Sequence, residues 1–292
     1  NKDRQIMSIT AAQVNELRNR TGAGILDCKK ALVESNGDME AAIDYLRKKG
    51  AALAAKRADR AANEGIVSAM VSADKKYGVL VEVNCETDFV AKSDDFVAFS
   101  KKVTELAFNK KANDVAAFIE STPEITTMLN EMTAKIGEKL QVGRVACLES
   151  ADGVVEYYIH YGDRLGSLVS FKNLEAGQVD SVASSLKDVA KQIAAMSPVA
   201  VSREEVPAEF IEKELEIYKE QFRKEGKPED KLDFIAKNKL GKYFEEVALL
   251  EQSFFREDKK TVGAWLEEVN KANGTKMSVG TFKRFNLGEG SK

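Results

Sequence analysis

The stretch Gly78-Val-Leu-Val-Glu-Val-Asn-Cys-Glu-Thr-Asp-Phe-Val90 changes its hydrophobic period part-way along. Up to Cys85 the apolar residues alternate with a period of two, which is typical of a β-strand. A polar run then leads to Phe89, and beyond it apolar residues recur at helical spacing: Phe96, Phe99, Val103 and Leu106. The order of strand, short polar-aromatic loop and helix favours an α+β fold.

Similar patterns occur on both sides of this stretch. Alternation over 67–71 predicts a strand that forms a hairpin with 79–85. Pro123 begins a helix whose apolar stripe runs to Leu140. A second set of three strands, a helix and a closing strand is expected at 145–148, 154–159, 167–171, 182–193 and 279–285. We therefore expect two related α+β subdomains.

The first part of the chain predicts three short helices. Thr10-Ala-Ala-Gln13 is a capping box that starts the first helix, and the glycines of Thr21-Gly-Ala-Gly24 end it. Asp38 can cap the third helix, and the second carries apolar residues at helical spacing: Ile25, Cys28 and Leu32. Three helices in so short a span predict a small bundle similar to a ubiquitin-associated (UBA) domain.

Residues 203–246 predict a pair of helices separated by Gly226-Lys-Pro228. Too few apolar residues line these helices to form a core of their own, so we expect an inserted helical hairpin that either lies on the main body or pairs with another copy. We favour a partner-binding or dimerising role. The predicted parts are a UBA-like helical module with its linker, a core N-subdomain, a core C-subdomain in two pieces, and the hairpin: 8–62, 63–141, 142–202 plus 247–288, and 203–246.

Composition excludes several classes of protein. Of 292 residues 43% are hydrophobic and 31% charged, and no apolar run is long enough to span a bilayer. Lys+Arg 44 against Asp+Glu 47 gives a net charge of −3, which lacks the footprint of a dedicated nucleic-acid binder. The N-terminal residues carry no apolar secretory signal, so we expect a cytoplasmic protein. We also expect that Met7 is the natural start and that residues 1–6 are an expression remnant.

The sequence offers little for catalysis. Three cysteines, no paired cysteine motif and the single His160 argue against a metal site, and we expect no metal and no cofactor. Cys85 and Cys147 are interpreted as buried small hydrophobic residues rather than nucleophiles. No phosphate-binding glycine loop occurs. We therefore expect a protein that acts on another protein and is not an enzyme.

Asp88 and Phe89 allow two interpretations each. Phe89 is either a core residue or an exposed ring that inserts into a partner, and Asp88 is either a helix cap or a carboxylate that perturbs a metal site. Spacing alone does not choose between them.

Two motifs closely resemble the bacterial elongation factor Ts family: Ile9 to Gly24 with Asp27 to Leu32, and Glu82 to Lys92. Shorter matches bring the similarity to about residues 8–288. The resemblance implies a guanine-nucleotide exchange factor for elongation factor Tu. It also implies that Thr87, Asp88, Phe89 and Val90 enter the partner's GTPase domain, where Phe89 wedges between helices and Asp88 approaches the magnesium region, so that GDP is released.

The resemblance implies further partner contacts at Arg18, Ile25, Leu26, Ile136, Gly137 and His160. For His160, a histidine satisfied by neighbouring tyrosines is an equal alternative. Some family members continue into a terminal helix, whereas this sequence ends at Lys292. Two rival hypotheses remain open at this point: an adaptor that docks through residues 8–48 and buries Phe89, and a hydrolase that uses Cys85 and His160.

Overall fold

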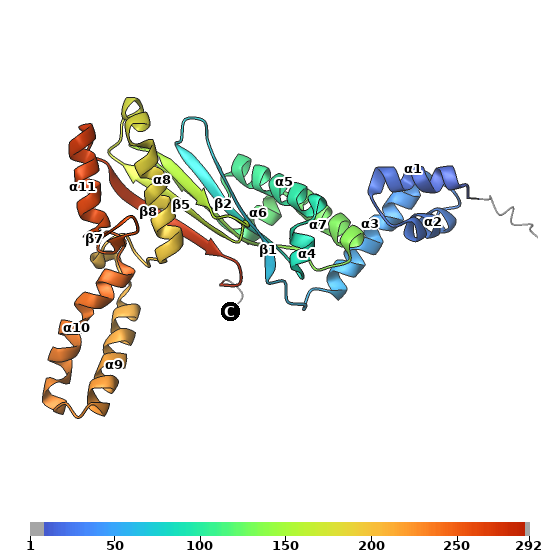
Figure 1. The fold of residues 1–292 in the computed structure, drawn as a ribbon. Helices are drawn as coiled ribbons and strands as arrows, with labels where there is room; N and C mark the ends of the chain where they lie inside the picture. The colour runs from blue at the N-terminus through green and yellow to red at the C-terminus, as the bar shows by residue number, and fades with distance from the viewer. Residues whose placement is uncertain (1–8, 290–292) are drawn as a thin grey trace, which may run out of the picture. The chain divides into compact units, whose positions relative to one another are not determined.

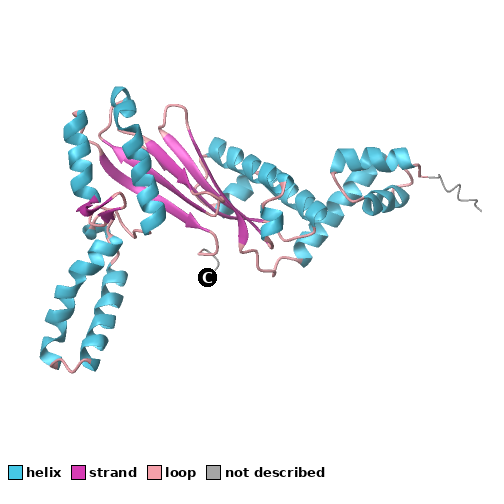
Figure 2. Cartoon of the chain, in the orientation of Figure 1, coloured by secondary structure: helices cyan, strands magenta, loops and turns pink. Residues whose placement is uncertain are grey.

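The computed structural model describes residues 9–289 (Figure 1). These residues divide into two compact units. The first unit comprises residues 9–68, 81–145 and 287–289. The second comprises residues 69–80 and 146–286. Helices and strands both contribute, so the α+β class is confirmed (Figure 2). Residues 1–6 and Met7 lie outside the described part, and the four-part division stays a prediction.

Three helices open the first unit: α1 (Ala11–Thr21), α2 (Ile25–Glu34) and α3 (Met39–Lys56). The predicted capping box is present, because the Gln13 N–H donates to Thr10 Oγ1 at 3.2 Å and the Thr10 N–H donates to Gln13 Oε1 at 3.0 Å. The Ala41 N–H donates to Asp38 at the start of α3. The helices bury one small core: Val14, Leu17, Ala23, Cys28, Ala31, Leu32, Ala42 and Leu46. Ile25 departs from its helical stripe and is 51% exposed.

The first sheet has the order β1-β2-β3, from β1 (Glu64–Val71), β2 (Tyr77–Cys85) and β3 (Gln141–Glu149). The strand expected at 145–148 therefore belongs to this sheet, whereas the sequence pattern grouped it with the later strands. Four helices connect β2 to β3: α4 (Asp88–Ala91), α5 (Asp94–Lys110), α6 (Val115–Ser121) and α7 (Pro123–Ile136).

The predicted end of α7 is wrong. The helix stops at Ile136 because Gly137 adopts a left-handed conformation, with φ of 81°, that terminates helices. Leu140 is buried, but it lies beyond the helix.

The second sheet is antiparallel in the order β4-β5-β8, from β4 (Val155–Ile159), β5 (Leu165–Lys172) and β8 (Ser278–Asn286). A single buried cluster joins apolar residues of β5 and β8 to those of α8 (Val179–Met196) and α11 (Val262–Asn273). A short ribbon of β6 (Ser253–Phe254) and β7 (Glu257–Thr261) precedes α11. Three 3₁₀ turns complete this unit at Ala176–Gln178, Arg203–Glu205 and Glu229–Lys231.

The predicted hairpin is formed by α9 (Ala208–Lys224) and α10 (Leu232–Val247), which lie side by side (Figure 1). No residue of α9, a helix described over its whole length, is buried. Lys219 bridges the two helices by an ion pair with Asp233 at 2.8 Å, and Lys239 Nζ donates to Gln221 at 2.9 Å. Polar contacts therefore hold much of this pair together.

Two buried glutamines connect the base of the hairpin to α8. Gln252, 1% exposed, donates to the carbonyl oxygens of Met196 and Glu246. The Gln192 amide donates to Gln252 Oε1, and Gln192 Oε1 accepts the Phe255 N–H at 2.9 Å. Side-chain amides thus join the ends of α8 and α10, beside the buried apolar cluster that contains Ile193 and Leu249.

Replacing Gln252 with leucine should destabilise the second unit by about 2 kcal/mol or more, because the Met196 and Glu246 carbonyl oxygens lose a donor and the Gln192 amide loses one of its two acceptors. Urea unfolding measures this change. Glu212→Leu, at an exposed site on α9, is the control and should shift stability by less than about 0.5 kcal/mol. Equal stability of the two variants would contradict the role assigned to the buried pair.

Within residues 9–289, no helix combines the length with the apolar character that crossing a membrane requires.

Candidate partner-binding site

Strand β2 ends at Cys85, and the next residues turn sharply into α4. The Cys85 side chain is fully buried, as predicted, and its thiol donates to the Thr87 carbonyl oxygen at 3.2 Å. Burial, assisted by the negative charges of Glu138 and Glu64, raises the pKa of Cys85 to about 12. The thiol therefore stays protonated near neutral pH, which is unsuited to a nucleophile.

Phe89 lies on a single helical turn rather than in the expected loop. Thr87 is the N-cap of α4 and accepts the Val90 N–H, and we call Thr87–Ala91 the Phe89 turn. The Phe89 side chain is 83% exposed, so its interpretation as a core residue is wrong. An exposed aromatic ring of this size on an ordered turn is typical of a binding anchor.

Asp88 occupies the first turn of α4 and is not its cap, because Thr87 holds that position. Its carboxylate is half exposed and pairs with Lys92 Nζ at 2.7 Å, one helical turn away. The hydrogen bond from Lys92 holds the pKa of Asp88 below its ordinary value. Asp88 therefore presents a negative charge beside the exposed ring of Phe89.

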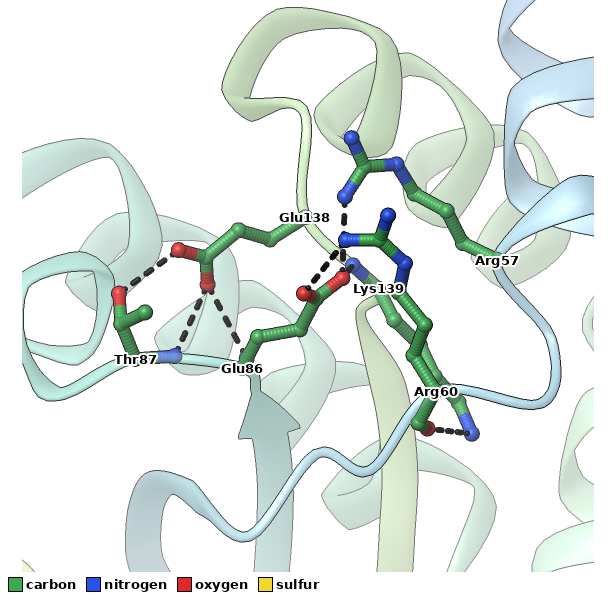
Figure 3. Close-up of polar contacts among 6 residues, drawn as sticks. All are labelled: Arg57, Arg60, Glu86, Thr87, Glu138 and Lys139. Atoms are coloured by element: carbon green, nitrogen blue, oxygen red, sulfur yellow. Dashed lines mark hydrogen bonds and ion pairs between the residues drawn. The ribbon is translucent and has the colours of Figure 1, made fainter.

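Glu138 binds the start of the Phe89 turn through both of its carboxylate oxygens (Figure 3). The N–H groups of Glu86 and Thr87 each donate to Glu138 Oε2 at 3.0 Å. The Thr87 hydroxyl donates to Glu138 Oε1 at 2.7 Å. One ionised side chain thus satisfies three donors where the strand ends, and charge-assisted bonds of this kind are the stronger class.

The side chain of Glu86 makes the reverse connection. Its carboxylate accepts the Lys139 N–H at 2.6 Å and pairs with Arg57 at 3.1 Å and Arg60 at 3.0 Å (Figure 3). Lys139 Nζ also donates to the Arg60 carbonyl oxygen at 2.9 Å. We call Glu86 and Glu138 the carboxylate clamp. It ties the end of β2 to the residues that follow α3 and α7.

Gly137 makes this arrangement possible. Its left-handed conformation reverses the chain at the end of α7, so that Glu138 and Lys139 follow directly. Ile136 is partly buried immediately before it. Both residues implied by the resemblance therefore lie next to the clamp.

The remaining predicted site residues lie elsewhere. In the N-terminal helices Arg18 is exposed, and Leu26 is 82% exposed beside the half-exposed Ile25. His160 belongs to the second unit, is exposed, and shares a hydrogen bond of 2.9 Å with the Tyr158 hydroxyl. The histidine is thus partnered by a neighbouring tyrosine and still accessible to a ligand.

Comparison with known proteins assigns the family. The family model described as Elongation factor TS matches residues 86–289. The chain belongs to the elongation factor Ts family. An elongation factor Ts from Chlorobium chlorochromatii is 46% identical over 288 residues, covering 96% of this chain and 99% of the relative. Relatives from Chlorobaculum parvum and Prosthecochloris aestuarii, both named elongation factor Ts, are 44% and 42% identical over 287 residues, with the same coverage.

Membership of the elongation factor Ts family confirms the predicted resemblance and places the protein among translation elongation factors. Among residues 9–289 no group of three or more histidine, cysteine or acidic side chains is arranged to hold a metal ion. The expected absence of cofactors and metals stays a prediction.

Sequence reasoning missed the clamp. Glu138, Arg57, Arg60 and Lys139 are spread along the chain, and the bonds from Thr87 to Glu138 join residues 51 positions apart. The one available signal was Glu86, an acidic residue directly after an apolar strand. There the backbone N–H groups of Glu86 and Thr87 lie beyond the strand and bind Glu138 instead.

The clamp should be sensitive to acid. Burial alone raises the pKa of Glu86, but hydrogen bonds from the Lys139 N–H, Arg60 and Arg57 outweigh burial and hold the pKa below its ordinary value. A lowered pKa stabilises the folded state above the ordinary value of about 4.3, and that stabilisation is lost as pH falls through the lowered pKa. The backbone amide signal of Lys139 in nuclear magnetic resonance should therefore titrate below about pH 4.3. In Glu86→Gln this titration should disappear, and a midpoint at or above the ordinary pKa would contradict the assignment.

Proposed function

We propose that the protein is the guanine-nucleotide exchange factor of elongation factor Tu, the general role of its family. It binds the GDP complex of that GTPase, promotes GDP release and so allows GTP to enter. The observation that carries this proposal is the exposed ring of Phe89 on a turn held by the carboxylate clamp. An ordered scaffold keeps this apolar ring exposed to water, so the free energy of the complex is lowered when a partner buries the ring.

The proposed mechanism uses two neighbouring side chains. Phe89 inserts between helices of the GTPase domain, and Val90 and Thr87 accompany it at the rim. Asp88, whose partner in the free protein is the exposed Lys92, brings a carboxylate toward the magnesium site. Mg²⁺ requires near-ideal octahedral coordination. A displaced ligand or a nearby charge therefore weakens the binding of Mg²⁺ to the nucleotide phosphates. No covalent bond changes, and the protein is not an enzyme in that sense.

The other predicted contacts are proposed to hold the protein on its partner rather than to displace the partner's magnesium ion. Arg18, Ile25 and Leu26 are each exposed on the N-terminal helices, which suits attachment to the same partner. Ile136 and Gly137 lie beside the clamp, and His160 offers a contact from the second unit. Each is proposed as a partner-binding residue.

The rival hypotheses fare less well. The adaptor hypothesis expected Phe89 to be buried, whereas its side chain is 83% exposed. The hydrolase hypothesis needed a thiolate at Cys85, whereas burial favours the thiol. The proposed exchange factor requires the exposed ring of Phe89 and makes no use of a thiolate at Cys85.

The hairpin is proposed as the homodimer contact. It exposes Phe210, Ile217 and the 69% exposed Phe234. Sedimentation at several protein concentrations tests this proposal, and a monomer at every concentration would contradict it. As a translation factor without the charge of a nucleic-acid binder, the protein is proposed to act in the cytoplasm through protein contacts.

Equilibrium binding tests the proposed function through thermodynamic linkage. If the protein weakens GDP binding to elongation factor Tu, GDP must weaken the binding of the protein by the same factor. Calorimetry should show tighter binding to the nucleotide-free GTPase than to its GDP complex. Equal affinities would favour an adaptor and contradict an exchange factor.

A further inference from the structure

We infer that Glu138 is a positioning residue for nucleotide exchange, which holds the Phe89 turn in the orientation that enters the partner. The inference rests on the proposed function, but its starting point is a local geometry. Glu138 itself is 51 to 52 residues away along the chain from the groups that it binds, and neither composition nor motif marks it.

The bonds to Glu138 fix the turn in two directions. Oε2 accepts two consecutive backbone N–H groups, from Glu86 and Thr87, which sets the path of the chain as it leaves β2. Oε1 accepts the Thr87 hydroxyl, which sets the rotamer of the N-cap residue. The direction in which α4 starts is therefore determined by one carboxylate.

Glu138 is itself held in place by the reciprocal half of the clamp. The Glu86 carboxylate accepts the N–H of Lys139, the residue next to Glu138. Gly137, on its other side, adopts the left-handed conformation that ends α7. Because both neighbours are fixed, Glu138 loses little conformational freedom when it binds the turn.

Apart from Glu138, the Phe89 turn is held by hydrogen bonds and not by a packed core of its own: the Cys85 thiol donates to the Thr87 carbonyl oxygen at 3.2 Å, and the Ser93 hydroxyl donates to the Val90 carbonyl oxygen at 2.8 Å. A helix of four residues is far below the length at which helices are stable alone in water. Of its four residues, all described, Ala91 alone is buried, and the ring of Phe89 adds almost no contact within the free protein. Hydrogen bonds at the start of the turn thus take the place of a packed core, and without them the ring would have to be ordered at each encounter with the partner.

The experiment compares Glu138→Ala with Glu138→Gln. A glutamine can place its carbonyl oxygen where Oε2 accepts the two N–H groups and its amide where Thr87 Oγ1 can accept, whereas alanine removes every bond. Glu124→Ala, at an exposed glutamate in the first turn of α7, is the matched control. Catalysed GDP release is measured against exchange-factor concentration, together with hydrogen exchange of the Glu86 and Thr87 amides and the melting temperature.

We expect Glu138→Ala to lower the maximal exchange rate at least about tenfold, equivalent to about 1.4 kcal/mol, less than one charged hydrogen bond contributes. The half-saturating concentration should change by less than about threefold, because contacts outside the turn are intact. The two amides should lose protection, and the melting temperature should fall by several degrees without loss of the fold, because three part-buried donors lose their acceptor. Glu138→Gln should recover most of the rate, and Glu124→Ala should match wild type.

Loss of amide protection with an unchanged exchange rate would overturn the positioning role and leave the proposed function intact. A wild-type protein that fails to accelerate GDP release would overturn both. If Glu138→Ala does not fold, Thr87→Val takes its place, because it removes the hydroxyl donor to Oε1, together with the oxygen that accepts the Val90 N–H. An unchanged maximal rate in that variant would likewise contradict the inference.

Discussion

Replacing Phe89 with alanine should slow catalysed GDP release at least about 30-fold while the free energy of unfolding stays within about 0.5 kcal/mol of wild type. The loss follows because an aromatic anchor buried at an interface contributes about 2 kcal/mol or more, and the preserved stability follows because the ring is exposed in the free protein. Exchange kinetics and urea unfolding of the same preparation measure both quantities.

Val97→Ala is the control for this variant. Val97 is also an exposed hydrophobic residue, 47% exposed on α5, and its truncation should leave the exchange rate near wild type. A loss of about 3 to 5 kcal/mol in the stability of Phe89→Ala would instead indicate a core residue and would return the adaptor hypothesis to favour.

The second large effect is expected at Gly65, in β1. Its φ of +150° lies in a region that residues with side chains rarely adopt, and an added Cβ would lie 2.1 Å from the Val83 carbonyl oxygen of β2. Backbone atoms cannot move aside cheaply, so Gly65→Ala should destabilise the first unit by about 3 kcal/mol or more. Urea unfolding measures the change.

The displacement caused by Gly65→Ala should also reach the site. Val83 lies two residues before Cys85, where β2 ends and the clamp begins, so the folded fraction of the variant should promote GDP release more slowly than wild type.

Gly241→Ala is the control, and its expected effect on the free energy of unfolding has the opposite sign. At Gly241, in α10, an added Cβ would meet no described atom within 4 Å outside the adjacent residues and the backbone of its own helix, and alanine should stabilise the helix by up to about 1 kcal/mol. A Gly65→Ala protein as stable as wild type would contradict the close approach of β1 to β2 at this glycine.

Much of the fold could be predicted because its elements carry strong local patterns. The alternation over 79–85 and the capping box at Thr10 each depend on residues close together in sequence, and both are confirmed. The end of α7 could not be read from periodicity, since Leu140 continues the stripe while Gly137 changes the backbone. Cys147, expected to be buried like Cys85, is only partly so.

The candidate site was harder to predict for a physical reason. A phenylalanine after a strand has the same local pattern whether it is buried or exposed, because burial depends on what distant segments pack against it. The same holds for the clamp, whose partners meet only after α3, β2 and α7 have folded. The resemblance identified Thr87–Val90 as a candidate segment, and the structure adds the hydrogen bonds that hold this segment in place.

The most direct test of the account is the release of a fluorescent GDP analogue from elongation factor Tu, chased with unlabelled GDP, with and without substoichiometric amounts of this protein. The account predicts that the release rate rises with protein concentration and that each molecule discharges many GDP complexes, because the protein dissociates when nucleotide rebinds. A folded wild-type protein that leaves the release rate unchanged, even in excess over the GTPase, would contradict the account.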